Sequence, residues 1–93
     1  KDTFLTPAAP ATGEYKDRGS KFIAYAFPVE SESDWHARLE EVRKEHPKAR
    51  HYCFAFRLGN DGMQYRANDD GEPAGSAGRP ILGQIDSFGL TNV

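Results

Sequence analysis

The hydrophobic pattern begins with two short β-type runs that follow an extended lead-in. Residues 1–12 hold two prolines and several alanines without any period, which predicts an extended lead-in. Residues 14–18 and 21–29 are β-type runs on either side of a Gly-Ser dipeptide at 19–20. Because such a dipeptide suits a tight turn, the pattern predicts a β-hairpin whose second strand ends near Pro28.

A helical period replaces the alternation after this hairpin. The apolar side chains at i, i+4 and i+7 are Trp35, Leu39 and Val42. Ser31 or Ser33 suits the N-cap of a helix, and Pro47 cannot continue one. We therefore expect one amphipathic helix between these residues.

Alternation returns in the second half of the chain. The residues of 51–58 that share one face are Tyr52, Phe54, Phe56 and Leu58. Gly-Asn-Asp-Gly at 59–62 is a strong turn signal, which should fold this strand back onto residues 63–67. The pattern predicts a second hairpin with an aromatic core face.

A second helix is predicted close to the end of the sequence. The residues that share its apolar face are Ile81, Ile85 and Phe88. Pro80 suits the first turn, Gly89 suits the position after the last turn, and a further strand begins at Leu90. The order β-β-α-β-β-α-β predicts the α+β class: a two-layer sandwich with two helices on one face of a mainly antiparallel sheet.

Composition places the chain among small folded proteins. Its 93 residues allow one domain, and 38% hydrophobic with 28% charged residues is ordinary for a folded chain. No run approaches the roughly 18 apolar residues of a membrane span, and Cys53 is the single cysteine. We therefore expect no membrane partner and a cytoplasmic location. Because the net charge is −2, any binding of nucleic acid must be local.

The candidate binding chemistry lies in residues 66–80, where a glycine-rich loop runs into a helix start. Unpaired N–H groups at Gly75, Ser76 and Gly78 could cradle an anion beside the positive end of the helix dipole, and Arg79 would add charge. In the structural alternative, the glycines only permit turns and Arg79 is solvated.

Three carboxylates of the same segment, Asp69, Asp70 and Glu72, have a role that the sequence leaves open. They could gather a divalent cation, since hard cations prefer oxygen ligands, but their spacing is not that of a calcium loop. Such side chains more often cap turns or accept hydrogen bonds from nearby N–H groups. Asp70 or Glu72 could equally pair with Arg66. We predict no metal.

His51 and Cys53 would share a strand face, which raises the question of an activated thiol. Side chains at i and i+2 of a strand stand about 7 Å apart, which is too far for a direct hydrogen bond. We therefore expect a buried, inert thiol.

Basic side chains gather around the first turn and around the end of the first helix. The second of these clusters consists of Lys44, Lys48 and Arg50. Such clusters usually solvate a surface, but they can also contact phosphates. The candidates for contact with an anion or nucleic acid are therefore Lys16, Arg18, Lys21, Arg66, Gly75, Ser76, Gly78 and Arg79.

The loop carries a recognisable signature. An arginine leads into Asp-Asp-Gly-Glu-Pro at 69–73, and Gly-Ser-Ala-Gly-Arg-Pro follows at 75–80. The supporting pieces are Gly-Ser-Lys-Phe at 19–22, His-Pro at 46–47 and His-x-Cys at 51–53. Over residues 13–93 the sequence resembles the YigZ/IMPACT family of "imprinted ancient" proteins.

This resemblance implies a fold like the second domain of a small-subunit ribosomal protein and like domain IV of elongation factor G. It also implies a link to translation regulation, and it brings no catalytic residues and no cofactor. Family members carry more chain, so we expect residues 13–93 to form a domain cut before its last strand and before any C-terminal domain. The strand begun at Leu90 would then expose an edge open to self-association.

Three functional hypotheses follow. The leading one is a non-enzymatic, translation-associated module that contacts RNA, the ribosome or a ribosome-bound protein through the glycine-rich loop. The second is a phosphate- or nucleotide-binding domain of the small-molecule kinase type, because residues 73–78 look like the glycine-rich loop of the galactokinase and homoserine kinase class. The third is a metal-dependent hydrolase built on Asp69, Asp70 and Glu72.

Overall fold

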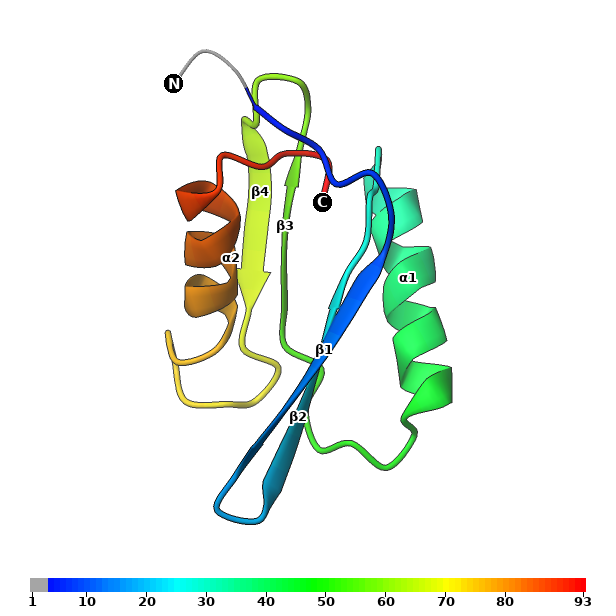
Figure 1. Cartoon of the computed structure of the whole chain (residues 1–93), viewed down its shortest axis with the longest axis vertical. Helices are drawn as coiled ribbons and strands as arrows, with labels where there is room; N and C mark the ends of the chain where they lie inside the picture. Colours follow the sequence, from blue (N-terminus) through cyan, green and yellow to red (C-terminus); the bar gives the residue numbers. More distant parts are fainter. Residues whose placement is uncertain (1–3) are drawn as a thin grey trace.

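The computed structural model describes residues 4–93, apart from the side chains of Tyr15 and Asp17. Hairpins and helices alternate along the chain (Figure 1). The elements are β1 (Ala11–Asp17), β2 (Ser20–Ala26), α1 (Glu32–Glu45), β3 (Phe54–Leu58), β4 (Gln64–Asn68) and α2 (Gly78–Ser87). The predicted α+β class is confirmed.

The first hairpin starts earlier than the sequence pattern predicts. β1 pairs with β2 in antiparallel register from Ala11 opposite Ala26 to Asp17 opposite Ser20, so pairing begins inside the predicted lead-in. Arg18 and Gly19 form the turn with φ angles of 48° and 82°. These positive angles are typical of the primed turns that match the twist of a hairpin.

The second hairpin pairs β3 with β4, from Phe54 opposite Asn68 to Leu58 opposite Gln64. Each hairpin forms a two-stranded sheet of its own, which differs from the single sheet that the sequence predicts. The strand predicted over 51–58 begins only at Phe54, because the residues before it contact the loop that follows β4.

Helix α1 begins at the first of its two candidate caps. The Ser31 hydroxyl accepts a hydrogen bond from the N–H of Asp34 at 3.2 Å, and the Asp34 carboxylate accepts one from the N–H of Glu30 at 3.0 Å. The Ser31 side chain caps the helix, and the Asp34 carboxylate reaches back to the residue before the cap, which explains the choice of Ser31 over Ser33. Within residues 4–93, neither helix is long and apolar enough to cross a membrane.

The core lies where α1 packs on β3. Its buried residues are Val29, Trp35, Phe56 and Leu58, with Phe27, Leu39 and Phe54 packed around them. The Trp35 ring lies 4.4 Å from the Phe54 ring and 5.1 Å from the Phe56 ring, centroid to centroid. The predicted apolar faces of the first helix and of the central strand therefore meet.

Helix α2 packs on β3 and β4 and is joined to β3 by an ion pair (Figure 1). The Arg57 guanidinium contacts the Asp86 carboxylate at 2.5 Å. Gly89 follows the helix with φ of 65°, as its predicted place requires. α2 starts at Gly78, so Pro80 lies in the first turn.

The last residues, which the sequence predicts to begin a strand, connect three parts of the fold. Val93 exchanges two backbone hydrogen bonds with Arg57, at 3.0 and 3.2 Å. Asn92 accepts one from the N–H of Val29 at 2.9 Å, and Leu90 forms an isolated parallel bridge with Leu5. Residues 90–93 are thus paired with the body of the domain.

Candidate functional site

The glycine-rich loop holds an anion, and that anion is the carboxylate of Asp69. It accepts hydrogen bonds from the N–H groups of Gly75, Ala77 and Gly78, at 2.9, 3.1 and 2.8 Å. These bonds, the one from Gly78 foremost, lower the pKa of Asp69, and the charge of Arg79 adds to the effect. Of the N–H groups proposed to cradle an external anion, those of Gly75 and Gly78 are therefore occupied by a side chain of the same loop, and that of Ser76 donates to the backbone oxygen of Pro73.

Gly78 allows this arrangement because it brings the start of α2 against the end of β4. A Cβ atom at Gly78 would lie 2.5 Å from the backbone nitrogen of Asn68 and 2.8 Å from its carbonyl carbon. No side chain fits at that distance. The glycine is thus required for close packing, which corresponds to the structural alternative.

Asp70 and Glu72 point to partners different from that of Asp69. Asp70 accepts a hydrogen bond from the N–H of Tyr52 at 2.6 Å, and Glu72 lies 3.5 Å from Nε2 of His51. Nδ1 of His51 is hydrogen-bonded to the backbone oxygen of Asp70 at 2.6 Å. Across the described part of the chain, no group of three His, Cys, Asp or Glu side chains is placed to hold a metal ion.

Arg66 does not form the ion pair considered for it. Its guanidinium lies over the ring of Phe54, 5.8 Å from the centroid, and in the described structure it pairs with neither Asp70 nor Glu72. Both carboxylates already have partners in the segment that precedes β3. Arg66 remains exposed and its charge faces solvent.

Cys53 is half-buried and is not arranged as a nucleophile. Its Sγ donates to the backbone oxygen of Asp69 at 3.2 Å, while the ring of His51 contacts the loop. Burial raises the pKa of the Cys53 thiol, and the nearby charges of Glu72 and Asp70 raise it further. The thiol therefore stays protonated and inert at neutral pH, although it is less buried than we predicted.

The side chains that the loop leaves for a ligand are few. The Ser76 hydroxyl donates to the backbone oxygen of Pro73 at 2.5 Å, so it is used within the loop. Arg79 is exposed in the first turn of α2. Among Gly75, Ser76, Gly78 and Arg79, only Arg79 thus has an exposed, positively charged side chain that could contact an anion.

The basic residues lie at the same end of the molecule as this loop. In Figure 1 the β1–β2 turn, the connection after α1 and the loop after β4 all lie at the lower end of the long axis. The exposed cations of the turn and the connection are Lys16, Arg18, Lys21, Lys48 and Arg50. Lys21 forms an ion pair with Glu14, and its Nζ lies 3.3 Å from Oε1 of the carboxylate. Two clusters far apart in the sequence thus lie toward the same end of the long axis of the molecule.

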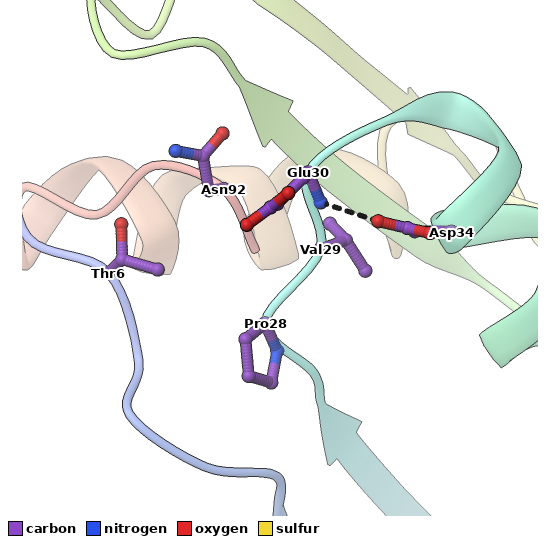
Figure 2. A pocket seen from close by; sticks show the side chains of 6 residues that line it. All are labelled: Thr6, Pro28, Val29, Glu30, Asp34 and Asn92. Atoms are coloured by element: carbon purple, nitrogen blue, oxygen red, sulfur yellow. Dashed lines mark hydrogen bonds between the residues drawn. The ribbon is translucent and has the colours of Figure 1, made fainter.

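A hollow of about 410 Å³ lies away from these basic residues. Figure 2 shows that Glu30 and Asp34 line it together with Thr6, Pro28, Val29 and Asn92. Asp34 belongs to the cap of α1, and Asn92 accepts a hydrogen bond from the N–H of Gly59 at 3.0 Å. Two carboxylates at this hollow oppose the entry of a phosphate.

The family model of the Impact N-terminal domain matches residues 18–93. The chain belongs to the IMPACT family. The IMPACT family member YigZ of Escherichia coli (strain K12) is 39% identical over 94 residues, which cover 99% of this chain and 46% of YigZ. An IMPACT family member of Haemophilus influenzae is 36% identical over 92 residues, which cover 97% of this chain and 45% of that protein.

The structure of the chain is also similar to a solved structure. A solved structure described as that of a hypothetical protein matches with a TM-score of 0.91 and 39% identity, over 99% of this chain and 46% of that chain. The chain spans about half the length of the IMPACT relatives described above. The glycine-rich loop and both arginines beside it, Arg66 and Arg79, lie inside the matched family range.

One polar cluster of this IMPACT domain has no counterpart in the sequence-based candidates. The Tyr25 hydroxyl donates to the carboxylate of Glu45 at 3.0 Å and is hydrogen-bonded to Nε2 of His46 at 2.6 Å. These contacts join β2 to the end of α1. The His-Pro pair at 46–47 belongs to the family signature, but no local sequence pattern links it to Tyr25.

Proposed function

We propose that this chain is a non-enzymatic, translation-associated module that contacts RNA, on its own or within the ribosome, through the basic end of the molecule. The observation that carries the proposal is that the β1–β2 turn and the connection after α1 lie toward the same end of the molecule and together carry five exposed cations. Because the net charge is −2, this concentration of cations is local. Phosphate contacts need such a local field.

The shape of the first hairpin supports this proposal. β1 and β2 form a two-stranded ribbon that extends to the lower tip of the molecule in Figure 1. Lys16 and Lys21 are opposite each other in the register, and Arg18 lies at the turn between them. A projecting ribbon can reach a groove or a backbone that the body of the domain cannot approach.

The glycine-rich loop contributes to this surface through side chains rather than backbone N–H groups. Asp69 occupies those groups, so the loop would offer Arg79 and the nearby Arg66. The same occupancy disfavours the kinase-type alternative, because a nucleotide phosphate would meet the Asp69 carboxylate where it needs donors. RNA contact by exposed cations does not require the carboxylate to leave.

A charge-removal experiment tests the proposal. Affinity for a labelled single-stranded RNA of about 12 nucleotides is measured for the original chain and for a Lys16→Gln/Arg18→Asn variant. Asparagine tolerates the positive φ of 48° at position 18, so the turn is kept. We expect about tenfold weaker binding and a salt slope that is less steep by about 0.7 for each lost phosphate contact.

Arg38→Gln is the control, because it removes one cation, ion-paired with Glu41, from the middle of α1. Its effect on RNA affinity should be small. Co-sedimentation with ribosomes is run with the same variants, and titration with ATP-Mg²⁺ is run in parallel. Absence of both RNA and ribosome binding, or equal losses in the Arg38 variant and the hairpin variant, would contradict the proposal. Nucleotide binding would favour the kinase-type alternative.

A further inference from the structure

The outer edge of β4 has no strand partner in the structure of residues 4–93. β3 pairs with β4 on one edge, and its Arg57 bonds to Val93 on the other. Since the N–H and C=O groups of one strand residue point to the same edge, those of Phe56 point to β4, where Arg66 lies opposite. The residues next to Arg66, Tyr65 and Ala67, therefore direct their N–H and C=O groups outward.

This edge lacks the features that usually prevent pairing between molecules. It contains no proline, no lysine and no bulge, and α2 packs across both β3 and β4. Met63 and Tyr65 are 73% and 60% exposed. A hollow of about 550 Å³ beside them is lined by Glu32, Phe56 and Met63 to Arg66. An apolar side chain and an aromatic one thus stand beside open backbone groups.

We propose that this edge pairs with the same edge of a second copy of the chain, antiparallel and centred on Tyr65. In that register Tyr65 is opposite Tyr65 of the second copy, Met63 is opposite Ala67, and Gln64 is opposite Arg66. Each Tyr65 exchanges both backbone hydrogen bonds with its counterpart. Each Ala67 N–H can donate to the carbonyl of Met63, whose own N–H is already bonded to Asp61.

The side chains match in this register and clash in the register whose two-fold axis lies at Arg66. Apolar groups meet apolar groups on the Tyr65 face, and on the other face each arginine meets a glutamine. A two-fold axis at Arg66 would place two guanidinium groups directly opposite each other, which is unfavourable. The sequence of β4 therefore favours the Tyr65-centred pairing over the one centred on Arg66. The self-association that we expected from the strand begun at Leu90 is placed instead on β4, because residues 90–93 are paired.

The association is weak because the strand is short. β4 has five residues, so its interface lies below the roughly 1,200 Å² of a stable complex. We expect a dissociation constant on the order of 0.1 to 1 mM. The dimer forms at high protein concentration and leaves the basic end of each copy accessible.

Sedimentation equilibrium of the chain, from about 10 μM to about 2 mM, tests this inference. Tyr65→Lys puts a charge at the centre of the pairing and should weaken association at least about tenfold. Gln84→Lys adds the same charge on an exposed position of α2 and should leave association unchanged. Melting transitions establish that both variants are folded.

Amide NMR spectra provide a second measurement that does not depend on a variant. The signals of Tyr65 and Ala67 should shift with protein concentration, whereas that of Arg66, whose N–H is bonded within the sheet, should shift less. A chain that is monomeric at about 2 mM, or a Tyr65→Lys variant that associates as the original does, would overturn the inference. RNA binding is measured separately, so failure here leaves the proposed function untouched.

Discussion

The Asp69 carboxylate accepts a hydrogen bond from the N–H of Gly78 at 2.8 Å, and this contact joins the end of β4 to the first turn of α2. Two more N–H groups of the loop bond to the same carboxylate. A negative group at this place also interacts favourably with the positive end of the helix dipole. The loop is therefore stabilised by an anion that it supplies itself.

The first prediction concerns acid stability. The pKa of Asp69 is lowered in the folded chain from its ordinary value of 3.8, so its contribution is present above that value and is lost as the pH falls through the lower, folded pKa. Asp69→Asn should lower the melting temperature at pH 7 by several degrees and make melting less dependent on pH below about 4. Thermal melts between about pH 2 and pH 7 measure both effects.

Asp61→Asn supplies the comparison for this experiment. Asp61 accepts one hydrogen bond from the N–H of Met63 in an exposed turn, so its replacement should leave the acid limb of the melting curve in place. An Asp69→Asn variant that keeps the original pH dependence would show that the three contacts of Asp69 do not stabilise the fold.

The second prediction compares the effect on stability of replacing two glycines of α2, Gly78 and Gly83. A Cβ at Gly78 would lie 2.5 Å from the backbone of Asn68, so Gly78→Ala should destabilise the domain by about 1 to 3 kcal/mol through overpacking. Gly83 has nothing within 4 Å of such an atom, so Gly83→Ala should stabilise it by about 0.5 to 1 kcal/mol. Urea denaturation measures both, and equal effects would refute the close approach at Gly78.

How much of the fold and of the loop could be predicted from the sequence depends on how far apart in the sequence the interacting residues are. Local periods located both helices. Turn dipeptides located the second turn and placed the first one residue too late, because Arg18 and Gly19 form it and Ser20 already belongs to β2. The N-cap Ser31 could also have been chosen from sequence, because only Ser31 has an acidic residue three positions later. The bond of Asp69 to Gly78 spans nine residues. It depends on φ of 45° at Asp70 and 88° at Gly71, which no hydrophobic period reveals.

The structure has two separate hairpins where the sequence predicts one sheet, and a local sequence pattern could not have revealed this. Alternation tells which residues of a strand share a face, but it does not tell which strands are neighbours. The pairing of Val93 with Arg57 is a contact between residues far apart in the sequence, and it leaves the first hairpin without a strand partner in the body of the described domain.

The third prediction concerns the thiol. The pKa of Cys53 is raised by burial and by Glu72 and Asp70, so the reactive thiolate is scarce at pH 8. Ellman's reagent should label the folded chain much more slowly than the urea-unfolded chain. Glu72→Gln removes one of the charges that raise the pKa, so it should speed labelling modestly. Labelling of the folded chain as fast as that of the unfolded chain would revive the nucleophile hypothesis.

The fourth prediction asks what the glycine-rich loop contributes to RNA binding. Because Asp69 occupies the N–H groups, any contribution must come from the charge of Arg79. Arg79→Gln should therefore weaken binding of the RNA probe and flatten its salt slope by about 0.7, the value for one phosphate contact to a single strand. Arg79→Glu should weaken binding further, since it places an anion at the start of α2.

A loss of stability must be separated from a loss of contact in the Arg79 variants. The charge of Arg79 helps to lower the pKa of Asp69, so Arg79→Glu also weakens the loop's internal anion site. Arg79→Gln does this less, and its melting temperature should stay close to that of the original chain. If folded Arg79→Gln binds RNA with unchanged affinity and salt slope while the hairpin variant does not, RNA contact is confined to the β1–β2 hairpin and the connection after α1. The loop would then serve only to hold α2 on β4.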